Sequence, residues 1–144
     1  MRLGEFMGAQ LPSYAILSHT WEEDEVTFQE FSDPQNATKK KGFAKIEKTC
    51  DQARQTGIGY VWVDTCCIDK TSSAELTEAI NSMFQWYAYS TVCYAYLSDL
   101  GDEDSVVDSW GGAMIKFAQS CWFTRGWTLQ ELIAPKIVEF YDSD

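Results

Sequence analysis

The stretch YAILSHT, Tyr14 to Thr20, decides the fold, because it is short, apolar and β-prone and ends in polar residues. Such a run is typical of a buried strand. The pattern recurs in GYVWVDT, Gly59 to Thr65, and in VCYAYLSD, Val92 to Asp99. A fourth run, KIVEFY, Lys136 to Tyr141, follows a proline. The sequence therefore predicts at least four strands spread along the whole chain.

Helical patterns separate these strands. Apolar residues recur at helical spacing from Gly42 to Thr56 and again from Ser73 to Tyr87, where Ser72 or Ser73 can cap the helix. Residues Met114 to Ala134 are predicted to be helical in two pieces, broken near Gly126. Polar loops are expected around residues 33–36 and across the acidic, glycine-punctuated segment 101–112.

Strands that alternate with helices favour a three-layer α/β fold. We expect a mostly parallel sheet of four to five strands, with helices on both faces, in one domain spanning residues 1–144. Ligands of such flavodoxin-like sheets bind beyond the carboxyl ends of the strands. Ser18, His19 and Trp21 follow the first predicted strand, residues 64–67 follow the second, and Asp99 follows the third. Polar side chains are therefore expected to gather at one edge of the sheet.

The composition excludes several classes of function. A chain of 144 residues with 45% hydrophobic residues can bury a core without disulfides or metals. The net charge of −11 argues against nucleic acid as a partner, because phosphate binding needs a basic face. No GxGxxG or GK[ST] motif provides a phosphate cradle. The N-terminal residues hold no run apolar enough for a signal peptide or a membrane span, so we expect a cytoplasmic protein without membrane contact.

The cysteines indicate free thiols and no metal site. The chain has five cysteines and one histidine, His19, and the adjacent Cys66 and Cys67 lack the spacing of a zinc knuckle. A nucleophilic pair of either cysteine with His19 is conceivable, but a cysteine beside a strand is more often a small buried hydrophobe. Asp64 and Asp69 flank the cysteines, and loop capping is favoured over ligand contact for both.

The segment FTRGWTLQEL, Phe123 to Leu132, places a glutamate on an otherwise apolar helix. Glu131 must be paired, reached by solvent or chemically useful, because burying a lone carboxylate is costly. The i, i+4 spacing puts Trp127 and Glu131 on one helical face, with Arg125 near the helix start. Two interpretations remain open, a structural ion pair of Arg125 with Glu131 and a functional carboxylate.

Three motifs in order, YAILSHTW, YVWVDTCCIDK with SSAELTEAINSMFQWY, and RGWTLQEL, resemble the heterokaryon-incompatibility (HET) domain of filamentous fungi. The resemblance runs from about Tyr14 to Tyr141. It implies a single HET domain that acts as the effector of non-self recognition and regulated cell death. It also implies receptor-like sensor domains or proteins as partners.

A more remote resemblance is to TIR domains, whose WCxxEL motif aligns with Trp127 to Leu132, with Thr128 in place of the cysteine. That similarity implies Glu131 as the catalytic residue of a NAD glycohydrolase that becomes active on self-association, with NAD as substrate and no cofactor. A carboxylate suits this chemistry, because breaking the nicotinamide–ribose bond passes through an oxocarbenium-like state. The alternative is a non-enzymatic scaffold that signals by homotypic assembly. The residues expected to contact substrate are Ser18, His19, Trp21, Asp64, Cys66, Asp69, Arg125 and Trp127.

Overall fold

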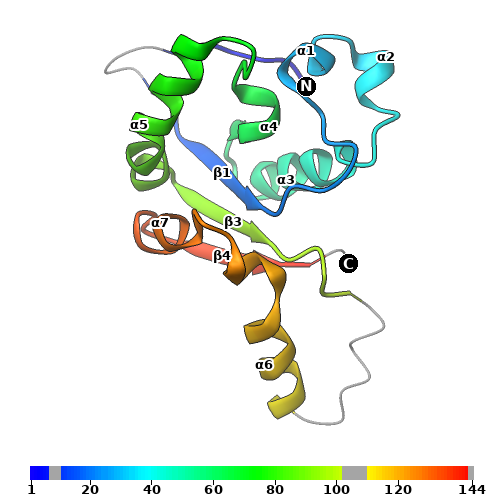
Figure 1. The fold of residues 1–144 in the computed structure, drawn as a ribbon, viewed down its shortest axis with the longest axis vertical. Coiled ribbons are helices and arrows are strands. Elements are labelled where there is room, and N and C mark those ends of the chain that lie inside the picture. Colours follow the sequence, from blue (N-terminus) through cyan, green and yellow to red (C-terminus); the bar gives the residue numbers. More distant parts are fainter. Residues whose placement is uncertain (7–10, 102–109, 143–144) are drawn as a thin grey trace.

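A computed structural model describes residues 1–6, 11–101 and 110–142, with the side chains of residues 110–113 left aside. Figure 1 shows a central sheet with helices packed around it. The elements in chain order are β1 (Tyr14–His19), α1 (Phe28–Phe31), α2 (Pro34–Ala37), α3 (Phe43–Gln55), β2 (Tyr60–Trp62), α4 (Asp64–Cys67), α5 (Ser73–Tyr89), β3 (Val92–Tyr96), α6 (Trp110–Gln119), the 3-10 helix η2 (Cys121–Thr124), α7 (Thr128–Ile133) and β4 (Val138–Tyr141).

The sheet is parallel throughout the described residues, with the strand order β2-β1-β3-β4. In register, Tyr14 lies opposite Tyr60 on one side of β1, and Ala15 lies opposite Val92 on the other side. The chain runs from β1 outward to β2 and then crosses to β3, so β1 is where the strand order reverses. The predicted α/β class, the parallel sheet and its four strands are confirmed.

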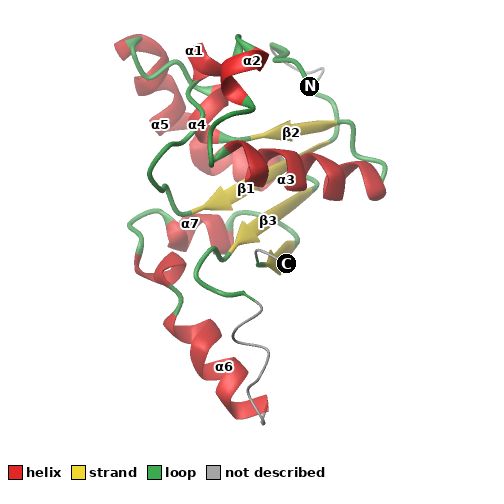
Figure 2. Ribbon diagram, turned by 90° about the vertical axis from the view of Figure 1, so that its right-hand side faces the viewer, coloured by secondary structure: helices red, strands yellow, loops and turns green. Residues whose placement is uncertain are grey.

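The alternation of side chains along β1 divides the core into two parts. Ala15 and Leu17 point to the face covered by α1 to α4 and pack with Ile46 of α3. Ile16 points to the opposite face, where Tyr87 of α5 packs against it. Figure 2 shows α3 in front of the strands, with α7 lying near β3. Because successive residues of a strand face opposite sides, the last two residues of β1 must also diverge.

Local signals in the sequence set the ends of the main helices. The Ser72 hydroxyl accepts the backbone N–H of Glu75 and so caps α5, as expected. Gly57 has a φ of +76°, the left-handed conformation that glycine adopts without a Cβ clash, and it follows the end of α3. The end of α3 lets the chain turn into β2, and the capped start of α5 begins the crossover from β2 to β3.

Some predicted loops are helical in the structure. Residues 28–37 form the short helices α1 and α2, where the Thr27 and Asp33 side chains cap the first turns. Residues 110–112, expected in a loop, begin α6, while residues 102–109 of that predicted loop lie outside the described part of the chain. Asp64 and Thr65, predicted at the end of a strand, begin α4. The region 114–134 is broken twice, after Gln119 and after Thr124, and not only near Gly126.

Candidate functional site at the carboxyl ends of the strands

Two groups of polar residues lie at the carboxyl end of β1, one on each face of the sheet. Ser18 points to the face of α5 and α7, and His19 points to the face of α3 and α4. Both side chains are buried, with 1% and 2% of their surface exposed. The alternation of strand side chains thus sends two neighbouring polar residues into two different environments.

The first group is built around Glu131 of α7. The Ser18 hydroxyl donates a hydrogen bond to Oε2 of Glu131, and the indole Nε1 of Trp122 donates to the Ser18 Oγ at 2.8 Å. Nη2 of Arg125 lies 2.8 Å from both carboxylate oxygens of Glu131. Glu131 is 3% exposed, so its charge is balanced within the protein and not by water.

This arrangement answers the question that FTRGWTLQEL raised. The structural ion pair between Arg125 and Glu131 is present, and Ser18 completes the hydrogen bonding of the carboxylate. Trp127 and Glu131 lie one helical turn apart, as the spacing predicted, since the Glu131 N–H donates to the Trp127 carbonyl oxygen at 3.3 Å. Their surroundings differ, because Trp127 is 46% exposed while Glu131 is buried. Arg125 directly follows the 3-10 helix η2, and residues 126 and 127 connect it to α7.

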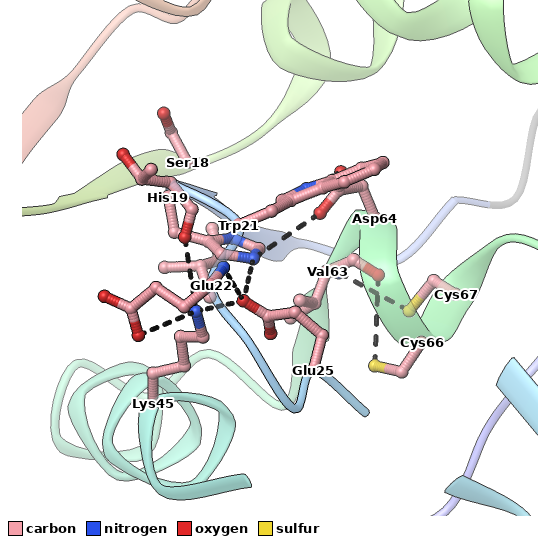
Figure 3. Close-up of polar contacts among 12 residues, drawn as sticks. Ser18, His19, Trp21, Glu22, Glu25, Lys45, Val63, Asp64, Cys66 and Cys67 are labelled. Carbon is pink, nitrogen blue, oxygen red and sulfur yellow. Dashed lines mark hydrogen bonds and ion pairs between the residues drawn. The ribbon is translucent and has the colours of Figure 1, made fainter. Parts of the chain in front are cut away.

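The second group lies on the opposite face and is shown in Figure 3. Nε2 of His19 is 3.8 Å from Oδ1 of Asp64 and 3.9 Å from Oε1 of Glu25, so neither contact is a hydrogen bond. Both ring nitrogens of His19, Oδ1 of Asp64 and Oε2 of Glu25 are buried without a hydrogen-bond partner. Such a concentration of unpaired polar atoms is unusual for a protein interior and marks a functional candidate.

Asp64 is the carboxylate of this second group with the most perturbed acidity. Burial raises the pKa of Asp64 to about 6, although the Lys70 charge and the hydrogen bond from Trp21 oppose the shift. Trp21 Nε1 donates to Oδ2 of Asp64 at 2.8 Å, and the Lys70 ammonium lies 3.6 Å from the centre of the Trp21 ring. A carboxyl group with a pKa near neutrality can exchange a proton under physiological conditions.

The other charges of the second group hold it in place. Burial lowers the pKa of His19 well below its usual value, and the nearby positive charges of Lys45, Arg125 and Lys70 lower it further, so the imidazole is neutral. Lys45 of α3 is 5% exposed and forms an ion pair with Glu25. Its ammonium also donates to the carbonyl oxygen of Thr20 at 3.3 Å, which ties α3 to the segment after β1.

Comparison with known proteins decides the family. The family model described as heterokaryon incompatibility protein (HET) matches residues 14–112. The chain belongs to the HET family. It is also 50% identical over 140 residues to the vegetative incompatibility protein HET-E-1 of Podospora anserina, an alignment that covers 94% of this chain. That alignment covers only 10% of the relative's length, and no solved structure matches the chain.

The family match confirms the resemblance seen in the motifs. Ser18, His19 and Asp64 fall within the family match. The alignment with the relative covers nearly the whole chain, whereas the family match ends before Arg125 and Glu131. Among residues 1–6, 11–101 and 110–142, no helix has the length and apolar character needed to cross a membrane.

Three residues predicted to contact substrate do not join either group of this HET domain. Cys66 is 2% exposed and packs in the core with residues of α3, where the neighbouring Cys67 thiol and then burial raise its pKa far above the usual range. Asp69 accepts hydrogen bonds from Thr71 and from Gln29, the capping role that the sequence favoured. Trp127 is exposed at the start of α7.

Asp99, which was predicted at the edge of the sheet, also has a structural role. Its carboxylate accepts the Ser120 hydroxyl and the backbone N–H of Cys121, both at 2.7 Å, and so fixes the start of η2. The described residues hold no group of three or more His, Cys, Asp or Glu side chains suited to a metal ion. The polar residues that follow β1 and β2 come together at the site, and those that follow β3 do not.

Sequence reasoning missed four residues of the HET site. These residues supply the charges and the indole donor around the two carboxylates, namely Glu25, Lys45, Lys70 and Trp122. Glu25 lies in the acidic run WEEDE, where nothing in the local pattern distinguishes it from solvated neighbours. Lys45 is one of three basic residues in the predicted helix 42–56, with Lys48 and Arg54, and nothing in the local pattern marks it as the buried one.

Proposed function

We propose that this HET domain is a cytoplasmic cell-death effector of fungal non-self recognition, driven by receptor-like sensor domains or proteins. We further propose that it hydrolyses NAD at the nicotinamide–ribose bond through Glu131 after self-association. The observation that supports this most directly is the position of Glu131, whose carboxylate is oriented by Ser18 and Arg125 at the carboxyl end of β1. In parallel α/β sheets this edge, at the strand where the order reverses, is where ligands bind.

The chemistry needs only a carboxylate in a low-dielectric setting. As the bond to the cationic nicotinamide breaks, positive charge develops on the ribose, and a fixed negative charge stabilises it. The Ser18 hydroxyl, itself held by Trp122, keeps the carboxylate in one orientation. A carboxylate held in this way does not have to reorganise during the reaction, which is the main source of electrostatic catalysis.

The described conformation is a resting state under this proposal. Arg125 neutralises Glu131, and the carboxylate is closed to solvent at 3% exposure. The guanidinium must turn away before a ribose can approach, and the pyrophosphate of NAD offers Arg125 an alternative bidentate partner. Self-association, which favours the conformation that assembles, supplies the remaining free energy for the change.

The test measures nicotinamide release from NAD by the purified chain at high concentration. We expect release by the natural chain and a loss of at least about 100-fold in Glu131→Gln, a change that keeps shape but removes the charge. Near-ultraviolet circular dichroism checks that both proteins are folded. Because Glu131→Gln leaves Arg125 unpaired, the double variant Arg125→Met with Glu131→Gln serves as a second inactive form. Equal release from the natural chain and both variants, or no release from any, would contradict the assignment.

A second candidate is a non-enzymatic module that signals by homotypic assembly. It is favoured by large apolar side chains that are 48–69% exposed on α5, on α7 and just before β4, namely Ile80, Phe84, Leu129, Ile133 and Ile137. A surface of this kind is suited to a protein partner. If Leu129→Asp abolishes both assembly and cell death while Glu131→Gln leaves cell death intact, the domain works as a scaffold.

A further inference from the structure

The geometry points to Asp64 as a second catalytic carboxylate, which accepts the proton of the water that attacks ribose C1′. This inference rests on the proposed hydrolysis of NAD and assigns Glu131 and Asp64 different tasks in it. Glu131 stabilises the positive charge on the ribose, and Asp64 activates the water. From the sequence, Asp64 was expected to cap a loop or to contact substrate, and the activation of water goes beyond both expectations.

Asp64 lies at the same edge of the sheet as Glu131. Asp64 begins α4 directly after β2, the neighbour of β1, so its carboxylate reaches the same edge of the sheet as Ser18 and Glu131. It lies beside His19, which follows Ser18 in β1 but faces the other side of the sheet. The negative charge of Glu131 contributes to the raised pKa of Asp64, so the field of Glu131 reaches Asp64 across the end of β1. Two carboxylates that approach a sugar from opposite sides are the arrangement that water-activating glycosidases use.

The Asp64 carboxylate is more available than Glu131 to accept a proton from water. Both carboxylate oxygens of Glu131 accept from Nη2 of Arg125, whereas the close contacts of Asp64 within the described residues are the Trp21 indole and the more distant His19. The Asp64 side chain is 19% exposed, against 4% for that of Glu131. Oδ2 accepts the Trp21 N–H and retains a second lone pair for a proton. The stacked ammonium of Lys70 fixes the Trp21 ring and so fixes this carboxylate oxygen.

The acidity of Asp64 also suits a general base. A general base works best when its pKa lies just below the working pH, and the pKa of Asp64 is raised to about 6. Charged and titratable groups reach it from every side: His19 from β1, Glu25 after β1, Lys70 before α5, and Arg125 and Glu131 from the C-terminal segment. Neutral His19 adds no charge of its own, so burial is the main cause of the raised pKa of Asp64, with Glu131 raising it further and Lys70 and Arg125 lowering it.

The reaction balances without any other reagent. The bond between C1′ and the nicotinamide nitrogen breaks, and its electron pair leaves with nicotinamide as a neutral base. A water oxygen bonds to C1′, and one of its protons passes to Asp64, which returns it to solvent. The products are ADP-ribose, nicotinamide and one proton.

The experiment compares hydrolysis with base exchange in the purified full chain and in Asp64→Asn. Labelled nicotinamide can re-enter NAD by attacking the same ribose cation, and this neutral ring nitrogen needs no base. We expect Asp64→Asn to lose about 100-fold or more of ADP-ribose formation while it keeps exchange within a few-fold of the natural chain. The rate of hydrolysis by the natural chain should decrease as the pH is lowered through about 6. Any residual hydrolysis by the variant should not show this decrease. Asp51→Asn, which removes an exposed carboxylate on α3, should match the natural chain.

The outcomes separate the two proposals. Loss of hydrolysis with retained exchange supports Asp64 as the base, and Glu131→Gln should lose both reactions. An unchanged ratio of hydrolysis to exchange in Asp64→Asn overturns the role of Asp64 but leaves Glu131 catalysis standing. Equal loss of both reactions in a folded Asp64→Asn also overturns it, since that result indicates a structural role. If the natural chain supports neither reaction, both proposals fail together.

Discussion

Glu131 and Asp64 are two carboxylates at one edge of one sheet, but the protein treats them in opposite ways. Glu131 is paired with an arginine, hydrogen-bonded by Ser18 and closed to solvent. Asp64 has an indole donor, an unpaired buried oxygen and a raised pKa. An ion pair within the protein offsets the cost of burying a carboxylate, whereas burial without such a pair moves the Asp64 carboxyl towards its neutral form. The following predictions test that difference, beginning with the largest effect.

Removal of Arg125 should have the largest effect on stability. Arg125→Met leaves Glu131 buried without its counter-charge, and breaking a buried pair in this way costs about 3–5 kcal/mol. The free energy of unfolding in urea measures the loss. Arg54→Met, which breaks an exposed pair with Asp51, is the matched control and should cost no more than about 1 kcal/mol. Equal small losses in both variants would show that Glu131 does not depend on Arg125.

The raised pKa of Asp64 should make stability fall as the pH rises. The folded pKa of about 6 exceeds the usual value of 3.8, so between these values the folded state binds more protons than the unfolded state. Stability from this group is therefore fully present below about pH 4 and decreases up to about pH 6, by at most about 3 kcal/mol. His19 acts in the opposite direction, since its lowered pKa costs stability below about pH 6.5.

The contribution of Asp64 is isolated by the difference between the natural chain and Asp64→Asn. Urea unfolding at several pH values from 4 to 7 gives this difference directly. Asp64→Asn should gain stability relative to the natural chain as the pH rises, because the amide carries no buried charge. A difference that does not vary with pH would show that the carboxyl titrates alike in both states.

Loss of the Ser18 hydroxyl should destabilise the Glu131 side more moderately. Ser18→Ala removes one hydrogen bond to the carboxylate and leaves the Trp122 N–H without an acceptor, at a cost of about 1–3 kcal/mol. Thermal unfolding measures the change. Ser90→Ala, another buried serine whose hydroxyl donates only to a backbone carbonyl, is the control and should cost less. An equal cost would mean that Ser18 contributes nothing special to the carboxylate.

The smallest change should come from the Trp21 indole. Trp21→Phe removes the hydrogen bond that lowers the pKa of Asp64, so this pKa should rise further, with little effect on stability because Trp21 is 57% exposed. Carbon-detected NMR titration of the Asp64 carboxyl measures the shift. An unchanged pKa would remove Trp21 from the account of how Asp64 is held.

The strands and their order of appearance were predictable because each is a short apolar run with a polar end. Ser18, His19 and Asp64 could be placed at the sheet edge for the same reason. The partners Trp122 and Lys70 could not, because both come from segments whose positions depend on tertiary packing. Glu131 illustrates the limit well. Its spacing from Trp127 suggested one shared environment, but Glu131 is buried against Arg125 and Ser18 while Trp127 is 46% exposed just before α7.

The adjacency of Ser18 and His19 has a genetic consequence. One peptide unit of β1 supports both polar groups, and the pleat of the strand is all that assigns each side chain to its own group. Inserting or deleting a single residue earlier in β1 would exchange the two directions, presenting an imidazole to Glu131 and a hydroxyl to Asp64. Such a frame-preserving change would disable both carboxylates in one mutational step, so this strand should tolerate substitutions more readily than changes in its length.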